Sequence, residues 1–275
     1  YGNRFTTTRP QVTFDEREQY LLLREGFEDE TLIADLNLNV GLGGAKLTSV
    51  TSYINRNILV SRDASALTGS VSVDLGFPDA GVLLPSNLVD TTDLETWSQE
   101  VRIASDNDSP FQWVLGAFYS KVDRVYSQTL PTAGYDAVTD AVLGAGTSAA
   151  VANGFAANSP YNALLPYDIK QFALFGEVSF DLSDAFTATA GGRYYDFKET
   201  RSFKSGGLFA NGDNRTDSTK SSGFTPRFLL SYDLSDSVTV NAQASKGFRL
   251  GGVNDPLNLP LCTPADAALL GGFQD

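Results

Sequence analysis

Apolar and polar residues alternate over long runs of this sequence, and a period of two is compatible with extended strands that have two different faces. In residues 171–182, one set of alternate positions is apolar, whereas the other set carries Glu177 and Asp181. The apolar set holds no charge here or in the other segments of this kind. Each segment therefore predicts a strand with one apolar and one polar face. The other segments are 186–195, 224–234 and 238–245.

Four earlier segments predict further strands, with a less regular alternation. The connections between all these strands alternate in length, because each short turn rich in Gly, Asn, Asp, Ser or Pro is followed by a long link. The earlier strands are expected at 31–40, 45–57, 97–105 and 111–119. The short turns are Gly41–Gly44, Asp106–Pro110, Ser183–Ala185 and Ser235–Ser237, and the long links are 61–93, 130–167, 205–221 and the stretch from Leu250 onward.

A meander with short turns at one end and long loops at the other is the layout of outer-membrane barrels. We therefore predict an all-β fold, an antiparallel up-and-down transmembrane β-barrel that is partial, with about eight strands of a larger barrel. The clearest strands run to roughly 10–12 residues, enough for a tilted strand to cross a hydrocarbon core of about 30 Å. Pro226 lacks an N–H, so we expect it near a strand end or at a bulge.

Composition excludes several functions. The formal net charge of −13 argues against a nucleic-acid partner, because phosphate binding requires clustered Lys and Arg. The sequence contains no histidine, which removes the commonest general base and metal ligand. Glu177 and Asp181 lie about 13 Å apart along one strand face, too far for a glycosidase pair. We expect no catalytic residues, no cofactor and no metal site. Cys262 is a lone thiol or half of a disulfide whose partner lies outside this chain.

No run of about 18 apolar residues is present, so no transmembrane helix is expected. The polar start of the sequence does not resemble a signal peptide. Both features are those of an internal piece of a β-barrel.

Four motifs resemble the barrel of TonB-dependent receptors, and they occur in the order found in that family. Together they cover about residue 30 to residue 254. Residues 245–254 (SKGFRLGGVN) resemble SKGFRPGGxN, residues 223–227 (GFTPR) resemble GFTPK, residues 97–105 (WSQEVRIAS) resemble xSQExRxxS, and residues 47–53 (LTSVTSY) resemble LTSxTSY.

This resemblance implies a function in nutrient uptake. Such receptors are single-chain barrels of about 22 strands that are plugged by an N-terminal domain. They import scarce ligands, and the TonB complex pulls on the plug. The resemblance implies that residues 1–275 are part of one such barrel domain, in the outer membrane of a Gram-negative cell. The expected ligand is a ferric siderophore, and the expected partners are outer-membrane lipid, the receptor's own plug domain and the TonB complex. Because no plug, TonB box or closing C-terminal strand is recognised, the chain is expected to be an internal fragment.

Two alternatives stay open at this point. A passive outer-membrane porin would share the strand pattern, and an upstream plug domain in the parent gene would exclude it. A soluble secreted β-protein, such as an adhesin or carbohydrate-binding module, would bury the apolar faces in a core. That protein would be a stable monomer without detergent.

Candidate site residues fall into three groups. The lumen-facing candidates are Arg102, Glu177, Arg193 and Arg227. They form either a charge network that braces the barrel or contacts the plug, or a contact for an anionic ligand. Ligand contacts are also expected in the long extracellular loops, because loops on a rigid scaffold carry binding. The candidates there are Tyr135, Phe155, Tyr161 and Tyr167, although loop aromatics also pack on each other. A third group, Asp213, Asn214 and Asp217, indicates a solvated polar loop rather than a calcium site, because its spacing does not fit an EF-hand.

Overall fold

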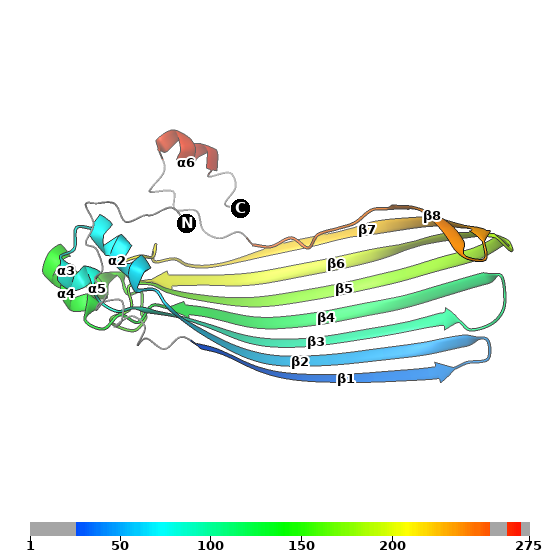
Figure 1. The fold of residues 1–275 in the computed structure, drawn as a ribbon, viewed down its shortest axis with the longest axis horizontal. Coiled ribbons are helices and arrows are strands. Elements are labelled where there is room, and N and C mark those ends of the chain that lie inside the picture. The colour runs from blue at the N-terminus through cyan, green and yellow to red at the C-terminus, as the bar shows by residue number, and fades with distance from the viewer. Residues whose placement is uncertain (1–25, 254–262, 271–275) are drawn as a thin grey trace.

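The computed structural model describes residues 26–253 and 263–270. Eight antiparallel strands form one open sheet in which neighbours in the sequence are neighbours in the sheet (Figure 1). This arrangement confirms the predicted all-β, up-and-down topology of about eight strands. The strands are β1 (Gly26–Gly41), β2 (Ala45–Asp63), β3 (Asn87–Ser105), β4 (Phe111–Thr129), β5 (Asn162–Ser183), β6 (Phe186–Gly206), β7 (Asn214–Ser235) and β8 (Val238–Ser245).

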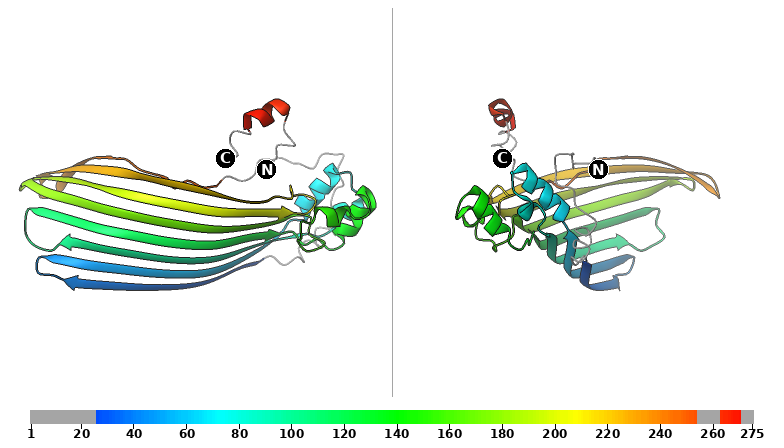
Figure 2. Two further views of the ribbon diagram at one scale, coloured as in Figure 1. Left: turned by 180° about the vertical axis from the view of Figure 1, so that it is seen from behind. Right: turned by 60° about the vertical axis from the view of Figure 1, so that its left-hand side comes forward.

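Short turns join the strands at one end of the sheet, and long loops join them at the other (Figures 1 and 2). The turns cover residues 42–44, 106–110, 184–185 and 236–237, so the four predicted turns are confirmed. In the first turn, Gly43 and Gly44 have φ values of +64° and +95°, in the region that glycine adopts without strain. The long loops cover residues 64–86, 130–161 and 207–213.

Short helices occupy the first two long loops and the end of the described chain. Helices α2 to α5 lie together at the loop end of the sheet, on the left of Figure 1. No helix in the described ranges is long and apolar enough to cross a membrane. The helices are α2 (Ser65–Asp74), α3 (Asp79–Val82), α4 (Tyr135–Leu143), α5 (Thr147–Val151) and α6 (Pro264–Leu270).

The strands extend much further toward the long loops than the sequence predicted. β7 has 22 residues and begins at Asn214, whereas its predicted strand begins at Phe224. The predicted link at 205–221 is therefore mostly strand, and Tyr167 lies within β5 instead of a loop. The alternation fails in this region because both faces are polar. Residues 214–222 read Asn-Arg-Thr-Asp-Ser-Thr-Lys-Ser-Ser and carry no apolar stripe.

The two faces of the sheet differ as the alternation predicted. We call the face that carries Leu174, Phe228 and Leu230 the apolar face, and the face that carries Glu177, Arg193 and Arg227 the charged face. Leu174, Phe228 and Leu230 are 47%, 57% and 47% exposed in the described structure. A soluble sandwich would bury these side chains against a second layer. In the described structure these side chains are exposed, unlike those in the core of such a sandwich.

Pro226 departs from the expectation of a strand end or a bulge. It lies inside β7 opposite Gly192 of β6, in a continuous ladder. Its position is explained by the β8 side of β7, where the β7–β8 ladder ends at the Arg227–Ser245 pair. The carbonyl of Pro226 accepts a last bond from the N–H of Lys246 at 3.0 Å. The missing N–H of Pro226 therefore coincides with the point where β8 stops pairing.

The three long loops share a small core of their own. Phe77 of the β2–β3 loop stacks on Tyr135 of the β4–β5 loop, with ring centroids 5.6 Å apart. Phe209 of the β6–β7 loop meets the edge of the same tyrosine at 5.6 Å. The Tyr135 hydroxyl lies 2.8 Å from Ser72 Oγ, and burial raises the pKa of Tyr135. We call Phe77, Val82 and Tyr135, with Leu208 and Phe209 packed against them, the loop core.

Candidate functional site

A cavity of about 430 Å³ lies on the charged face, at the end of the sheet that carries the long loops. Three neighbouring strands supply alternate residues to it, so one face of the sheet forms its floor. The β6–β7 loop closes one side with Asn211 and Asp213. The remaining lining residues are Arg124, Tyr126 and Gln128 of β4, Tyr161 immediately before β5, Ala163, Leu165 and Tyr167 of β5, and Arg201 and Phe203 of β6.

Two arginines flank one tyrosine ring in this cavity. The guanidinium carbon of Arg124 lies 5.3 Å from the ring centroid of Tyr167, and that of Arg201 lies 5.1 Å from it. These positions follow from the register, in which Tyr167 is the partner of Arg124 on one side and of Arg201 on the other. Both distances are within the range of a cation–π interaction. The three side chains thus present two fixed positive charges and an aromatic surface to one space.

A buried carboxylate supports the β4 wall of the cavity. Asp90 of β3 is 7% exposed. It accepts hydrogen bonds from the Tyr126 hydroxyl at 3.0 Å and from Gln128 Nε2 at 2.6 Å. Arg62 of β2 forms an ion pair with it. A buried charge is stable only when it is paired and hydrogen-bonded, and these three partners meet that condition. Asp90 therefore fixes two lining side chains without facing the cavity.

The chain after β8 reaches the opposite wall. Phe248 stacks on Tyr195 of β6 with ring centroids 4.0 Å apart and the planes 10° apart. The N–H of Val253 donates to Glu199 Oε1 at 3.1 Å, and Arg201 Nη1 donates to the carbonyl of Val253 at 2.9 Å. Residues 246–253 therefore lie across the charged face of β6. Their last contact holds the guanidinium of Arg201, which lines the cavity.

The predicted lumen-facing residues share the charged face but lie closer to the short turns. Arg227 Nη1 forms an ion pair with Glu177 Oε2 at 2.6 Å, across the intervening strand β6. Arg102 pairs with Glu100 at 3.0 Å, and the guanidinium carbon of Arg193 lies 5.5 Å from the ring centroid of Phe118. Charged side chains thus pair across this part of the face, and none of the four candidates lines the cavity.

A glycine makes the Glu177–Arg227 ion pair geometrically feasible. Gly191 is the register partner of both residues, so their side chains meet above it. A Cβ at Gly191 would lie 3.0 Å from Cβ and Cγ of Glu177 and 2.8 Å from the carbonyl oxygen of Gly176. Any side chain at this position would occupy the path of the ion pair.

The predicted loop aromatics divide into two pairs. Tyr161 and Tyr167 line the cavity. Tyr135, also predicted to contact ligand, is 1% exposed and lies within the loop core. Phe155 lies 4.9 Å from Lys204 Nζ, measured to the ring centroid, and does not line the cavity.

Sequence reasoning missed Arg124, Tyr126, Arg201 and Phe203. The period of two could have identified the β4 residues, because residues 124, 126 and 128 continue the charged face of the 111–119 strand.

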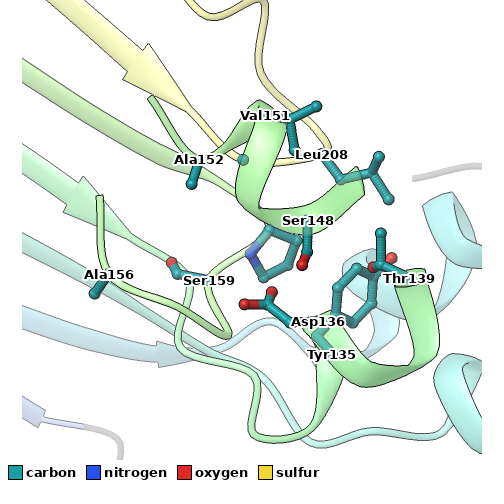
Figure 3. Close-up of a pocket in the computed structure, with 11 residues that line it drawn as sticks. Tyr135, Asp136, Thr139, Ser148, Val151, Ala152, Ala156, Ser159 and Leu208 are labelled. Carbon is teal, nitrogen blue, oxygen red and sulfur yellow. The ribbon is translucent and has the colours of Figure 1, made fainter. Parts of the chain in front are cut away.

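A second, much smaller cavity lies among the helices of the β4–β5 loop. Figure 3 shows Tyr135 and Asp136 of α4 and Ser148 of α5 around it. Its volume of about 10 Å³ has room for one water molecule at most. Nearby, the N–H of Ser148 donates to Asp140 at 2.8 Å, which lowers the pKa of that carboxyl. This cavity is part of the loop packing, and it is too small for a ligand.

The acidic residues considered for calcium are engaged in other contacts. Asp213 Oδ2 accepts a hydrogen bond from Ser205 Oγ at 3.0 Å, and Asp217 pairs with Arg215 at 3.0 Å. Asn214 and Asp217 lie in β7 instead of a loop. Among the described residues, no group of three or more Cys, Asp or Glu is placed to hold a metal ion. Cys262 lies outside those residues.

The comparison with known families agrees with the motifs. The sequence profile of the family described as "TonB dependent receptor-like, beta-barrel" matches residues 1–273. The chain belongs to the TonB-dependent receptor β-barrel family. No curated protein matches this TonB-dependent receptor chain significantly.

Solved receptors share the fold of this TonB-dependent receptor chain. The ferric yersiniabactin uptake receptor FyuA from Yersinia pestis superposes with a TM-score of 0.56 at 12% identity, over 79% of this chain and 28% of that receptor. The siderophore receptor PiuA from Acinetobacter baumannii superposes with a TM-score of 0.50 at 13% identity, over 80% of this chain and 32% of that receptor. The chain therefore spans less than a third of the length of either receptor.

Proposed function

We propose that this chain is the barrel segment of an outer-membrane receptor that imports a scarce anionic ligand by TonB-dependent transport. Membership of the receptor family supports this function, and the two matched structures are uptake receptors rather than enzymes. In this proposal the apolar face meets lipid, the charged face lines the lumen, and the long loops lie on the extracellular side. The outer membrane of a Gram-negative cell is the location that fits these assignments.

The observation that carries the proposal is the pair of arginines on either side of Tyr167. Guanidinium groups bind carboxylates and other oxyanions strongly, and tyrosine rings provide rigid aromatic contact area. A ferric siderophore with catecholate or carboxylate groups carries net negative charge and matches this wall. We assign Tyr161, Tyr167, Arg124 and Arg201 to ligand contact. Arg102, Glu177, Arg193 and Arg227 brace the lumen or contact the plug domain.

Transport of radioactive iron by the protein expressed from its complete gene tests this assignment. The assay uses an iron-starved outer-membrane host that lacks its own receptors, and catecholate, carboxylate and hydroxamate chelates are supplied separately. The double variant Arg124→Gln/Arg201→Gln is expected to weaken binding of an anionic chelate by at least about tenfold, because each charge-assisted hydrogen bond contributes about 1.5–3 kcal/mol.

The matched control is Arg56→Gln/Arg215→Gln, which removes the same charge from two ion pairs outside the cavity. It should leave binding within about twofold, well below the ~1.4 kcal/mol that a tenfold change represents. Equal losses in the two double variants would place the binding site elsewhere. Uptake that persists after the proton-motive force is collapsed would favour a passive channel instead.

A further inference from the structure

The floor of the cavity on the charged face consists of three rows of side chains, which follow one another toward the long loops. Successive rows are two residues apart on each strand, so the first and third rows are about 13 Å apart. In order toward the loops, the rows are Arg124, Tyr167 and Arg201, then Tyr126, Leu165 and Phe203, and then Gln128, Ala163 and Ser205.

The chemical character of the cavity changes from row to row. The first row presents two guanidinium groups beside the ring of Tyr167. In the second row the hydroxyl of Tyr126 donates to Asp90, so this row offers mainly aromatic rings and the aliphatic side chain of Leu165. In the third row the amide nitrogen of Gln128 donates to Asp90 and to the Tyr126 hydroxyl. The carbonyl oxygen of Gln128 is therefore the group that can accept a hydrogen bond from a ligand.

Asp213 of the β6–β7 loop adds a negative charge beside the third row. Its Oδ2 accepts a hydrogen bond from Ser205 Oγ at 3.0 Å, and its own N–H donates to the same hydroxyl at 3.0 Å. Its carbonyl accepts from the N–H of Ser205 at 3.0 Å. Of the described residues that line the cavity, Asp213 is the one with an acidic side chain, and it forms no ion pair with any described residue. A fixed carboxylate without a cation thus faces the cavity.

The positive and negative groups of the cavity do not neutralise each other. Their rows are about 13 Å apart, which exceeds the screening length of about 8 Å at physiological ionic strength. Within the described ranges Arg124 has no carboxylate partner, and its guanidinium contacts the rings of Tyr126 and Tyr167. The cavity therefore has a positive end and a negative end, with an apolar section between them.

We propose that the ligand of this cavity is a dipolar ferric chelate, whose oxyanion groups contact the arginines and whose protonated amine contacts Asp213. The inference rests on the proposed function and specifies the ligand of that same site. An ammonium group has three N–H donors and no acceptor, which matches the carboxylate of Asp213 and the carbonyl oxygen of Gln128. Its hydrogen bond to the carboxylate is charge-assisted and therefore strong. A chelate with negative charge at both ends would place one of its anionic groups against Asp213.

Binding of radiolabelled iron chelates to the full-length receptor in a neutral detergent tests this inference. One probe is a ferric catecholate chelate with a primary amine on an arm that spans the ~13 Å between the two rows, and the other is the same chelate after acetylation of the amine. The wild type should bind the amine form about tenfold more tightly, the contribution of one charge-assisted hydrogen bond. The acetylated form has one more negative charge, so attraction by the arginines alone would give the opposite order.

Two aspartate variants make the result specific. Asp213→Asn should reduce the preference for the amine form to within about twofold, because asparagine keeps an oxygen for Ser205 but carries no charge. The matched control Asp217→Asn removes the same charge from the ion pair with Arg215 outside the cavity, and it should keep the tenfold preference. This control is needed because a chain with a net charge of −13 attracts cations in general.

The arginine variant separates this inference from the proposed function. Arg124→Gln/Arg201→Gln should weaken binding of both chelates by a similar factor and leave the preference unchanged. Equal binding of the two chelates by the wild type, or an unchanged preference in Asp213→Asn, would overturn the dipolar ligand alone. Unchanged binding in the arginine variant, or no binding of either chelate to the wild type, would overturn the proposed function with it. If Asp213→Asn fails to fold, the comparison of the two chelates on the wild type still decides the inference.

Discussion

Replacing Val178 by arginine is expected to lower the free energy of unfolding in a bilayer by about 2–4 kcal/mol, the cost of arginine on the lipid face at mid-depth. Val178 lies on the apolar face, 43% exposed, with Trp113 and Ala190 as its register partners. Val178 is near the middle of the apolar-face positions that run from Phe172 to Leu182 on β5, so an arginine there has the longest distance to reach water. Leu174 and Leu230, whose row contains Phe180, are nearer the two ends of this run, and arginine at either position should cost less.

The neighbouring residue provides a matched control. Ser179 points to the charged face, where Thr189 lies 2.9 Å from its hydroxyl. Arginine at this position enters the polar side of the sheet and should cost far less than arginine at Val178. Denaturant titrations of both variants in phosphatidylcholine vesicles, followed by the gel mobility shift of folded barrels, measure the difference. Equal destabilisation would show that the two faces have been assigned wrongly.

Replacing Gly191 by valine is expected to destabilise the sheet by up to about 3 kcal/mol, as overpacking does. The new Cβ would lie inside van der Waals contact distance of the Gly176 carbonyl oxygen and of Glu177. The carbonyl belongs to the backbone of β5, which cannot move without disturbing the β5–β6 ladder. The added methyl groups would also separate Glu177 from Arg227.

The ion pair and the steric clash are distinguished by a double-mutant cycle. Glu177→Gln alone should cost less than about 1 kcal/mol, because the pair is partly exposed and such pairs contribute little. In a Glu177→Gly background, Gly191→Val should cost less than in the wild type, since two of the three close atoms are gone. Chemical denaturation in detergent micelles measures the wild type, the three single variants and the double variant. An unchanged cost in that background would show that Glu177 is not the obstacle.

The sequence predicted the half of each strand nearest the short turns much better than the other half. Near the turns, one face is apolar throughout, so Phe172 to Leu182 and their polar neighbours alternate clearly. In residues 214–222 of β7 both faces are polar, and nothing there distinguishes a strand from a loop. The period of two identifies a strand only where the two sides meet different surroundings.

The candidate site was predicted only in part, for a related reason. Tyr161 and Tyr167 were identified as loop aromatics, but the arginines beside Tyr167 lie in the parts of β4 and β6 beyond the predicted strand ends. Arg124 and Arg201 are 77 positions apart in the sequence, and only the register of β4, β5 and β6 brings them together. The burial of Tyr135 could not be predicted from the sequence either, because its partners Phe77 and Phe209 come from two other loops.

The loop core joins the three long loops at one end of the sheet. The ring of Tyr135 packs against Phe77 of the β2–β3 loop and against Phe209 of the β6–β7 loop. The three long loops are therefore connected through one residue. A displacement of any one of them must carry the other two or break that packing. Loops that already pack on one another lose less conformational entropy on binding a ligand than separate loops would.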